Sequence, residues 1–212
     1  MKLCGINWTE IFDLKNTFST NATTHSQVFT HSKYASLVMK DAIADTFKRK
    51  FNKRPNVDTE SADISINLHI AKHTCTVSLD SSGSSLHKRG YKSDMVTAPI
   101  NEVLAAGLIL LSDWNKKSDF HDPMCGSGTI LIEAALIAYN IPVNIFRDKF
   151  GFEGWKDFDK NLWETIKEVS LNKERHYYGS ITGSDNFQKA VRISRSNIEN
   201  ALLRENIKVT KS

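Results

Sequence analysis

The sequence has few cysteines, no metal-binding spacing and no long hydrophobic run, and each of these absences excludes a class of protein. Its three cysteines, Cys4, Cys75 and Cys125, show no C-x-x-C spacing, which argues against a zinc site or a disulfide framework and favours a reducing, cytoplasmic location. The seven histidines show no H-x-x-x-H spacing, so no metal is expected. No apolar run approaches the roughly 18 residues of a membrane span, and the N-terminus lacks the apolar stretch of a secretory signal. We therefore expect neither a membrane nor a metal partner.

The positive charge of the chain is small but unevenly distributed. The net charge is +4, whereas residues 33–54 alone carry seven basic and two acidic residues, a local surplus of five. A solvated helix end would favour such lysines because of the helix dipole, and RNA phosphates would favour them equally. The seven basic residues are Lys33, Lys40, Lys48, Arg49, Lys50, Lys53 and Arg54, of which the last five lie close together in the sequence.

The first third of the chain predicts a helix followed by a β-hairpin. Apolar residues recur at helical spacing over 33–51, and Pro55 ends that pattern. Two alternating runs, 64–70 and 75–79, then predict strands joined near His73 and Thr74. The polar stretch 19–26 is typical of a loop or turn.

The remainder predicts alternating strands and helices, and therefore an α/β fold. We expect a helix with Pro99 in its first turn and an apolar stripe of Leu104, Leu108 and Leu111. A short strand over 118–122, a helix to about 140, a strand ending at Asp185, a helix over 187–201 and a strand from Ile207 follow. The intervening aromatic-rich segment 141–178 is interpreted as an insertion packed by its aromatic residues.

The turn between the first of these strands and its helix is the most informative stretch of the chain. It reads Asp122-Pro123-Met124-Cys125-Gly126-Ser127-Gly128-Thr129. Gly126 and Gly128 allow a ligand to approach the backbone, and the N–H groups at a helix start favour polar or anionic groups. A phosphate-binding loop would need a lysine after the second glycine, and a dinucleotide fingerprint would need a third glycine where Leu131 stands. What remains suits a cofactor with an amine and ribose hydroxyls, such as S-adenosylmethionine; an ordinary strand-to-helix turn is the alternative.

This stretch resembles motif I of the THUMP-domain RNA methyltransferases, in particular the bacterial 23S rRNA guanine-N2 methyltransferases. The resemblance continues, in the order of that family, through residues 84–92, 98–106, 150–155 and 183–185. One departure is Val143-Asn144 before Arg147, where the family usually has a Pro-Gly pair.

The resemblance implies a partial THUMP-like α+β module followed by the N-terminal part of a Rossmann-like class I methyltransferase domain. On this basis residues 1–82 form the THUMP-like RNA-binding portion, 83–97 a connector, and 98–212 the methyltransferase part. S-adenosylmethionine is the implied cofactor, and 23S rRNA or a precursor ribosomal particle the implied partner. The residues implied for the cofactor are Asp122, Pro123, Cys125, Gly126, Ser127, Gly128, Thr129, Asp185 and Pro99. Those implied for RNA are Lys48, Arg49, Lys50, Lys53, Arg54, Lys88 and Arg89; residues 88–91 equally fit a connector folded onto the catalytic domain.

The family holds the target amine with an Asn-Pro-Pro-Tyr motif that this sequence lacks. Its four prolines, Pro55, Pro99, Pro123 and Pro142, are never adjacent, so we assign no catalytic residue. We therefore expect an incomplete methyltransferase that is inactive alone. A catalytically silent RNA-binding module or one half of a split enzyme is the alternative. A methyltransferase for DNA adenine or protein glutamine is a third reading, which the THUMP-like half disfavours.

Overall fold

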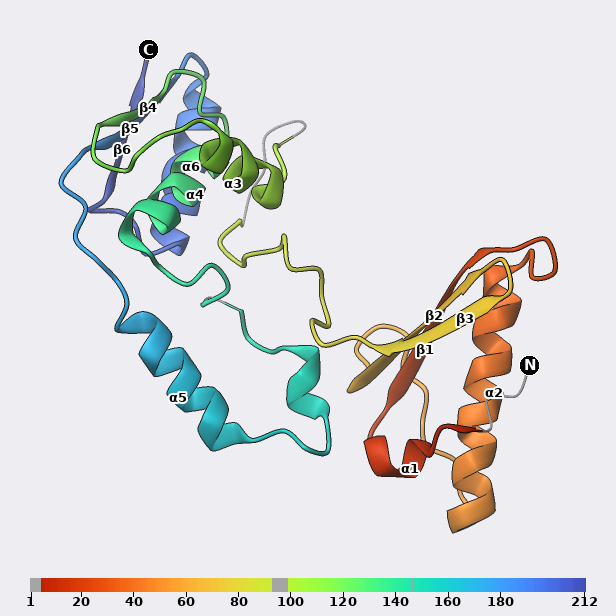
Figure 1. Cartoon of the computed structure of the whole chain (residues 1–212). Helices are drawn as coiled ribbons and strands as arrows, with labels where there is room; N and C mark the ends of the chain where they lie inside the picture. The colour runs from red at the N-terminus through yellow and green to blue at the C-terminus, as the bar shows by residue number, and fades with distance from the viewer. Residues whose placement is uncertain (1–4, 93–98, 146) are drawn as a thin grey trace. The chain divides into compact units, whose positions relative to one another are not determined.

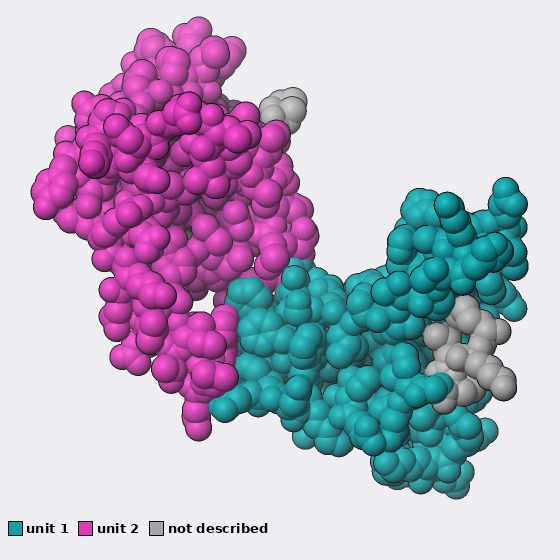
Figure 2. Space-filling model, in the orientation of Figure 1, with its two compact units in different colours: residues 1–84, 149–160 teal, residues 85–148, 161–212 magenta. Residues whose placement is uncertain are grey.

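The computed structural model describes residues 5–92, 99–145 and 147–212. Two compact units divide the chain (Figure 2). Unit 1 comprises residues 1–84 and 149–160, and unit 2 comprises residues 85–148 and 161–212. Each unit has its own hydrophobic core.

Unit 1 is a three-stranded sheet with one long helix packed against it (Figure 1). Its elements are α1 (Trp8–Ile11), β1 (Phe18–His25), α2 (Ser32–Phe51), β2 (Ile64–Ala71) and β3 (Thr74–Leu79). The sheet order is β1-β2-β3, with β1 parallel and β3 antiparallel to the central strand. Met39, Ile43 and Phe47 of α2 are fully buried in the core together with Ile66 and Leu68 of β2. The predicted helix and hairpin are confirmed.

The expectation of a loop over 19–26 was wrong, because these residues form β1. Phe18 aligns with Ile64 and His25 with Ala71, so the strand pairs along its whole length. The polar sequence of β1 did not predict a strand. Only one face of the strand is covered, and Thr20 and Thr24 occupy inward positions, where apolar residues would have indicated a strand.

Unit 2 is built on a short, all-parallel sheet. It contains α3 (Glu102–Leu111), β4 (Phe120–Asp122), α4 (Thr129–Tyr139), β5 (Ile181–Asp185), α6 (Gln188–Asn200) and β6 (Ile207–Lys211). The sheet order is β4-β5-β6, and every pairing is parallel. The β/α alternation predicted from the sequence is confirmed. Leu131 and Ile132 of α4 are fully buried, in a core that also contains Ile181 and Val191.

Helix α3 differs from its prediction in both its start and its buried face. It begins at Glu102, and its N-cap is Asn101, whose side chain accepts hydrogen bonds from the backbone N–H groups of Val103 (2.9 Å) and Leu104 (3.3 Å). Pro99 therefore precedes the helix. Leu104, Leu108 and Leu111 are 55%, 49% and 82% exposed, whereas Ala105 and Ile109 are buried. The helix is apolar nearly all round, so spacing alone could not decide which stripe faces the core.

The aromatic-rich insertion contributes to both units: residues 149–160 belong to unit 1, and residues 141–148 and 161–178 belong to unit 2. It contains the short 3-10 helix η2 (Gly151–Gly154) and helix α5 (Lys160–Leu171), which the sequence did not predict. Phe150 and Phe152 stack with ring centroids 5.3 Å apart, and Trp155 packs against the core of unit 1. Phe146 lies outside the described residues. None of the helices in the described part of the chain is long and apolar enough to span a membrane.

Candidate cofactor site

The glycine turn predicted from the sequence joins β4 to α4. β4 ends at Asp122, and α4 starts at Thr129 with Gly128 as its N-cap. Gly126 and Gly128 have φ values of 53° and 80°, in the left-handed region that favours glycine. A Cβ atom at Gly128 would also collide with the Ser194 hydroxyl of α6. The backbone conformation therefore favours glycine at both positions, and the packing against Ser194 additionally favours it at Gly128, whatever the turn binds.

Hydrogen bonds from the neighbouring elements hold the turn in place. The Cys125 N–H donates to the Ser184 carbonyl of β5 (3.0 Å), and the buried Asn197 amide of α6 donates to the Ser127 carbonyl (3.0 Å). Within the turn, the Met124 N–H donates to the Asp122 carboxylate (3.0 Å), and the hydroxyls of Ser127 and Thr129 lie 3.2 Å apart. The turn is thus pre-formed rather than shaped by a ligand.

Asp185 lies at the end of β5 and contacts this turn directly. Its Oδ2 accepts a hydrogen bond from the Gly126 N–H (2.9 Å), and its Oδ1 accepts one from the Phe187 N–H (2.9 Å). A carboxylate oxygen has two lone pairs, so each retains one acceptor position. The structure therefore brings together two predicted site segments, residues 122–129 and Asp185.

Cys125 is a neutral, buried member of the turn. Burial, reinforced by the negative charges of Asp122 and Asp185, raises the pKa of its thiol to about 11. The side chain is 6% exposed and packs in the core of unit 2. It is therefore suited to packing and unsuited to nucleophilic chemistry near neutral pH.

Pro99, the remaining residue implied for the cofactor, lines a different cavity. This cavity has a volume of about 450 Å³ and is lined by His87, Lys88, Arg89, Gly90, Lys92 and residues 99–102. The residues of the glycine turn are not part of its lining. The described contacts thus do not bring Pro99 to the turn.

Arg89, for which an RNA-binding role is implied, is a buried residue. Its side chain is 8% exposed, and its Nε lies 3.4 Å from Glu133 Oε1, while its Nη1 donates to the Leu86 carbonyl (3.0 Å). The Tyr91 hydroxyl donates to the same Glu133 oxygen (3.1 Å). Arg89 therefore anchors residues 86–91 to α4, and both its RNA-binding role and the connector alternative stay predictions. Lys88 is exposed.

Glu133 is the residue that sequence reasoning missed. It is fully buried in α4, and burial raises its pKa, although Arg89 and Tyr91 oppose that shift. A second buried pair, Lys92 and Glu102 (3.2 Å), lies at the start of α3. The sequence signal that could have identified Glu133 as a buried carboxylate is that it is the one charged residue in the otherwise apolar helix α4.

The basic residues of unit 1 gather at the C-terminal end of α2. All five are exposed, and three have intramolecular partners. Arg54 forms an ion pair with Asp45 (2.7 Å), Arg49 Nε donates to the Asp45 carbonyl (3.3 Å), and Lys50 donates to the Thr9 hydroxyl (2.8 Å). The structure groups these residues, and it places Lys88 in the other unit.

Comparison with known proteins identifies two domains in the chain. A family model described as RMKL-like, methyltransferase domain, matches residues 89–212, and a THUMP domain model matches residues 3–80. Solved structures with the same fold include SMU.472 in complex with SAH (28% identity, TM-score 0.85, 98% of this chain and 55% of that one). A second is a predicted N6-adenine-specific DNA methylase from Listeria monocytogenes (29% identity, TM-score 0.83, 97% of this chain and 54% of that one). A third is a possible methylase from Clostridium difficile (33% identity, TM-score 0.83, 98% of this chain and 55% of that one). The chain spans about half the length of these structures.

Proposed function

The chain belongs to the RMKL-like methyltransferase family, and on this premise we propose that it forms the S-adenosylmethionine-binding part of an RNA methyltransferase. The observation that supports this most strongly is the hydrogen bond between Gly126 and Asp185, 59 residues apart. It unites a glycine turn at a helix start with an acidic residue at the end of the adjacent parallel strand. Ligands of open α/β sheets bind at this edge, beyond the carboxyl ends of the strands.

The residues present fit such a cofactor. Gly126 and Gly128 carry no Cβ atom, so a ligand can approach the backbone at these two positions, and the 11-residue helix α4 begins directly after Gly128. Asp185 keeps acceptor positions for ribose hydroxyls, and Asp122 carries a carboxylate beside the turn. When bound, S-adenosylmethionine supplies an electrophilic methyl group on a sulfonium. The chain's own residues would hold its ribose and its amino-acid end, with residues 122–129 and Asp185 as the contacts; the ribose contact at Asp185 stays a prediction.

The substrate class proposed is RNA, and more narrowly the exocyclic N2 of a guanine in 23S rRNA. The THUMP match over residues 3–80 supports RNA over DNA, although a solved relative from Listeria carries a DNA-methylase description. The sequence blocks shared with the guanine-N2 methyltransferases support the narrower proposal. We further assign residues 1–82 to RNA binding, 83–97 to a connector and 98–212 to cofactor binding, in a cytoplasmic protein. Within the first part, the exposed basic end of α2 is the proposed phosphate contact.

A second candidate is a catalytically silent RNA binder or one half of a split methyltransferase. No two prolines are adjacent within the given 212 residues, so these residues contain no Asn-Pro-Pro-Tyr motif that could accept the target amine. The two candidates share cofactor and RNA binding and differ in methyl transfer.

Titration calorimetry with S-adenosylhomocysteine on the 212-residue chain tests the proposed cofactor site. We expect saturable 1:1 binding that Gly126→Val abolishes, because a branched side chain at φ 53° would block the turn and strain its backbone. Gly107→Ala is the matched control, because nothing lies within 4 Å of an added Cβ there. Unchanged affinity in Gly126→Val, with an intact circular dichroism spectrum, would contradict the site. The 212-residue chain is expected to be inactive alone under either candidate, so transfer of labelled methyl groups to unmodified 23S rRNA is measured with the native protein isolated from its source cells; transfer supports the first candidate and its absence the second.

A further inference from the structure

The three-stranded sheet of unit 1 has one face that α2 does not cover. The strand register assigns eleven residues to this face, because residues directly opposite one another in paired strands share a face. They are Ser19, Asn21, Thr23 and His25 of β1, Ser65, Asn67, His69 and Ala71 of β2, and Thr74, Thr76 and Ser78 of β3. We call these eleven residues the polar face.

Two contacts confirm that the polar face is a single surface. The hydroxyls of Ser19 and Ser65 lie 3.1 Å apart on neighbouring strands. The rings of His25 and His69 meet edge to face, with centroids 5.8 Å apart. The residues of the opposite face, among them Ile64, Ile66 and Leu68, are buried in the core with α2.

The composition of the polar face is unusual for a merely solvated surface. A quarter of the chain is charged, so eleven positions would carry about three charged residues by that average, yet none of the eleven is charged. Ten of them have a side-chain hydroxyl, amide or imidazole. Lysine, the residue that commonly protects exposed edge strands, is absent from all three strands. Ser19 is buried, and the rest of the surface is rich in hydrogen-bonding groups without being charged.

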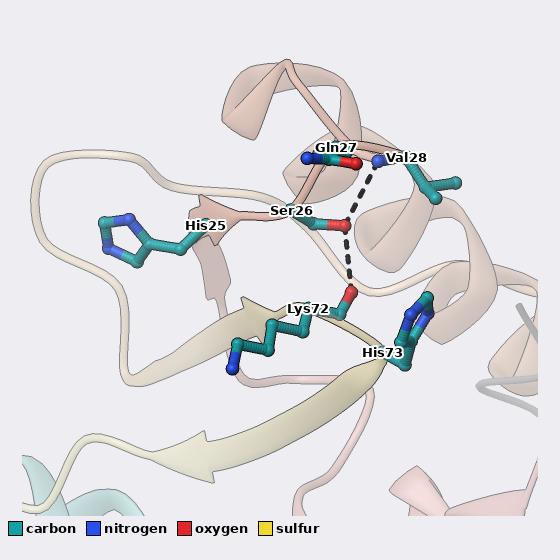
Figure 3. A pocket seen from close by; sticks show the side chains of 6 residues that line it. All are labelled: His25, Ser26, Gln27, Val28, Lys72 and His73. Carbon is teal, nitrogen blue, oxygen red and sulfur yellow. Dashed lines mark hydrogen bonds between the residues drawn. The ribbon is translucent and has the colours of Figure 1, made fainter.

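A cationic cavity stands at one end of the polar face. It has a volume of about 490 Å³, and none of its lining residues is acidic: His25, Ser26, Gln27, Val28, Lys72 and His73 (Figure 3). Figure 3 shows the side chains of His25 and Lys72 on one side of the turn between β2 and β3, and those of Val28 and His73 on the other side. The Lys72 N–H donates to the His25 carbonyl (3.0 Å), and the Ser26 hydroxyl donates to the Lys72 carbonyl (2.9 Å). These bonds hold Lys72 in a left-handed conformation with φ 52°.

We propose that the polar face and this cavity bind single-stranded RNA. Hydroxyl and amide side chains suit the edges of unstacked bases and the 2′-hydroxyl, and imidazole rings suit base stacking. Lys72, at the end of the face, suits a phosphate. The inference rests on the proposed function and deepens it, because it assigns nucleotide recognition to a surface other than the basic end of α2. A protein partner fits less well, since the face offers no large apolar side chain for the centre of an interface.

Fluorescence anisotropy with a labelled single-stranded RNA of about 12 nucleotides tests this proposal. His69→Glu and Thr76→Glu each place a negative charge at directly opposed positions of the polar face. We expect each to weaken binding at fixed salt by about tenfold, through repulsion of phosphate in both variants and, in His69→Glu, also through lost stacking. Thr59→Glu, an exposed position in the loop between α2 and β2 and outside the eleven residues of the polar face, is the matched control and should change affinity by less than about twofold, since a single surface charge outside the binding face contributes little at moderate salt.

The outcomes separate this inference from the proposed function. If the unaltered chain binds RNA but neither polar-face variant weakens it more than Thr59→Glu, the inference is overturned and the proposed function stands. If the two polar-face variants lose as much affinity for duplex RNA as for single-stranded RNA, the preference for single-stranded RNA is overturned. If the unaltered chain binds S-adenosylhomocysteine but no RNA, both the inference and the RNA part of the proposed function fail. Thr76→Glu lies on an exposed edge strand, so it remains informative if His69→Glu does not fold.

Discussion

The Gly126 N–H donates a 2.9 Å hydrogen bond to the Asp185 carboxylate, and this contact ties the glycine turn to the end of the neighbouring strand. Asp185 is 9% exposed, so the bond is shielded from water. It sets the position of both groups before any ligand arrives.

Substitutions of Asp185 should separate its structural role from its proposed binding role. Asp185→Ala leaves the Gly126 and Phe187 N–H groups without their acceptor, which should cost about 1–3 kcal/mol of unfolding free energy. Asp185→Asn keeps one acceptor oxygen and should recover part of that stability, but it should bind S-adenosylhomocysteine about tenfold or more weakly. Urea unfolding and calorimetry measure the two effects. Full affinity in Asp185→Asn would exclude the carboxylate as a ribose contact.

Gly128→Ala should destabilise the protein, whereas Gly107→Ala should not. At Gly128 the new Cβ meets the Ser194 hydroxyl and the backbone has φ 80°, so we expect a loss of about 1–3 kcal/mol. At Gly107, inside α3, an added methyl meets nothing and should raise helix stability by about 0.5–1 kcal/mol. Thermal unfolding measures the change in Tm of each variant relative to the unaltered protein. Equal changes in Tm for the two variants would contradict the close packing of the glycine turn against α6.

The Cys125 thiol should react with iodoacetamide only in strongly alkaline solution. Because its pKa is raised to about 11, the reactive thiolate is scarce at pH 7–9, and its alkylation rate should still rise as the pH passes 10. Cys75 is exposed and serves as the accessible comparison, in a protein in which Cys4 is replaced by serine. Mass spectrometry of the two peptides follows the reaction. Rapid modification of Cys125 at pH 8 in the folded protein would contradict its burial.

Glu133→Gln should change the pH dependence of stability. Burial raises the pKa of Glu133 in the folded protein above its unfolded value, so the unaltered protein loses stability as pH rises from below the unfolded pKa through the folded one. The glutamine variant lacks that loss. The stability of the unaltered protein relative to the variant should therefore fall as the pH rises above 4.5, the ordinary pKa of a glutamate. Urea unfolding as the pH rises above this value tests the sign, and a rising difference would mean that the Arg89 ion pair outweighs burial.

The two faces of α3 should respond differently to substitution. Ile109 is 4% exposed, and Ile109→Ala should cost about 2–5 kcal/mol by leaving a cavity. Leu111 is 82% exposed, and Leu111→Lys should change stability by less than about 0.5 kcal/mol. Chemical denaturation compares the two variants. A large loss in Leu111→Lys would instead support the apolar stripe expected from the sequence.

Local patterns were sufficient wherever one residue type had a strong conformational reason. The glycines of the turn, the periodic apolar face of α2 and the alternation in β2 each predicted an element that the structure contains. Local sequence patterns were not sufficient for an element of which only one face is buried, such as β1, or for a uniformly apolar element, such as α3. β1 is mostly threonine, serine and asparagine, and α3 is apolar nearly all round, so neither showed which way its side chains face.

The sequence by itself determined the order of strands and helices in the α/β part and the position of the glycine turn, because these depend on local backbone preference and periodicity. Only the tertiary structure decided which distant residues meet. Asp185 reaches the turn because β5 lies parallel beside β4, and Arg89 turns inward because Glu133 is buried in α4. The same distinction applies to the polar face, which exists only because three strands align their outward residues in one register.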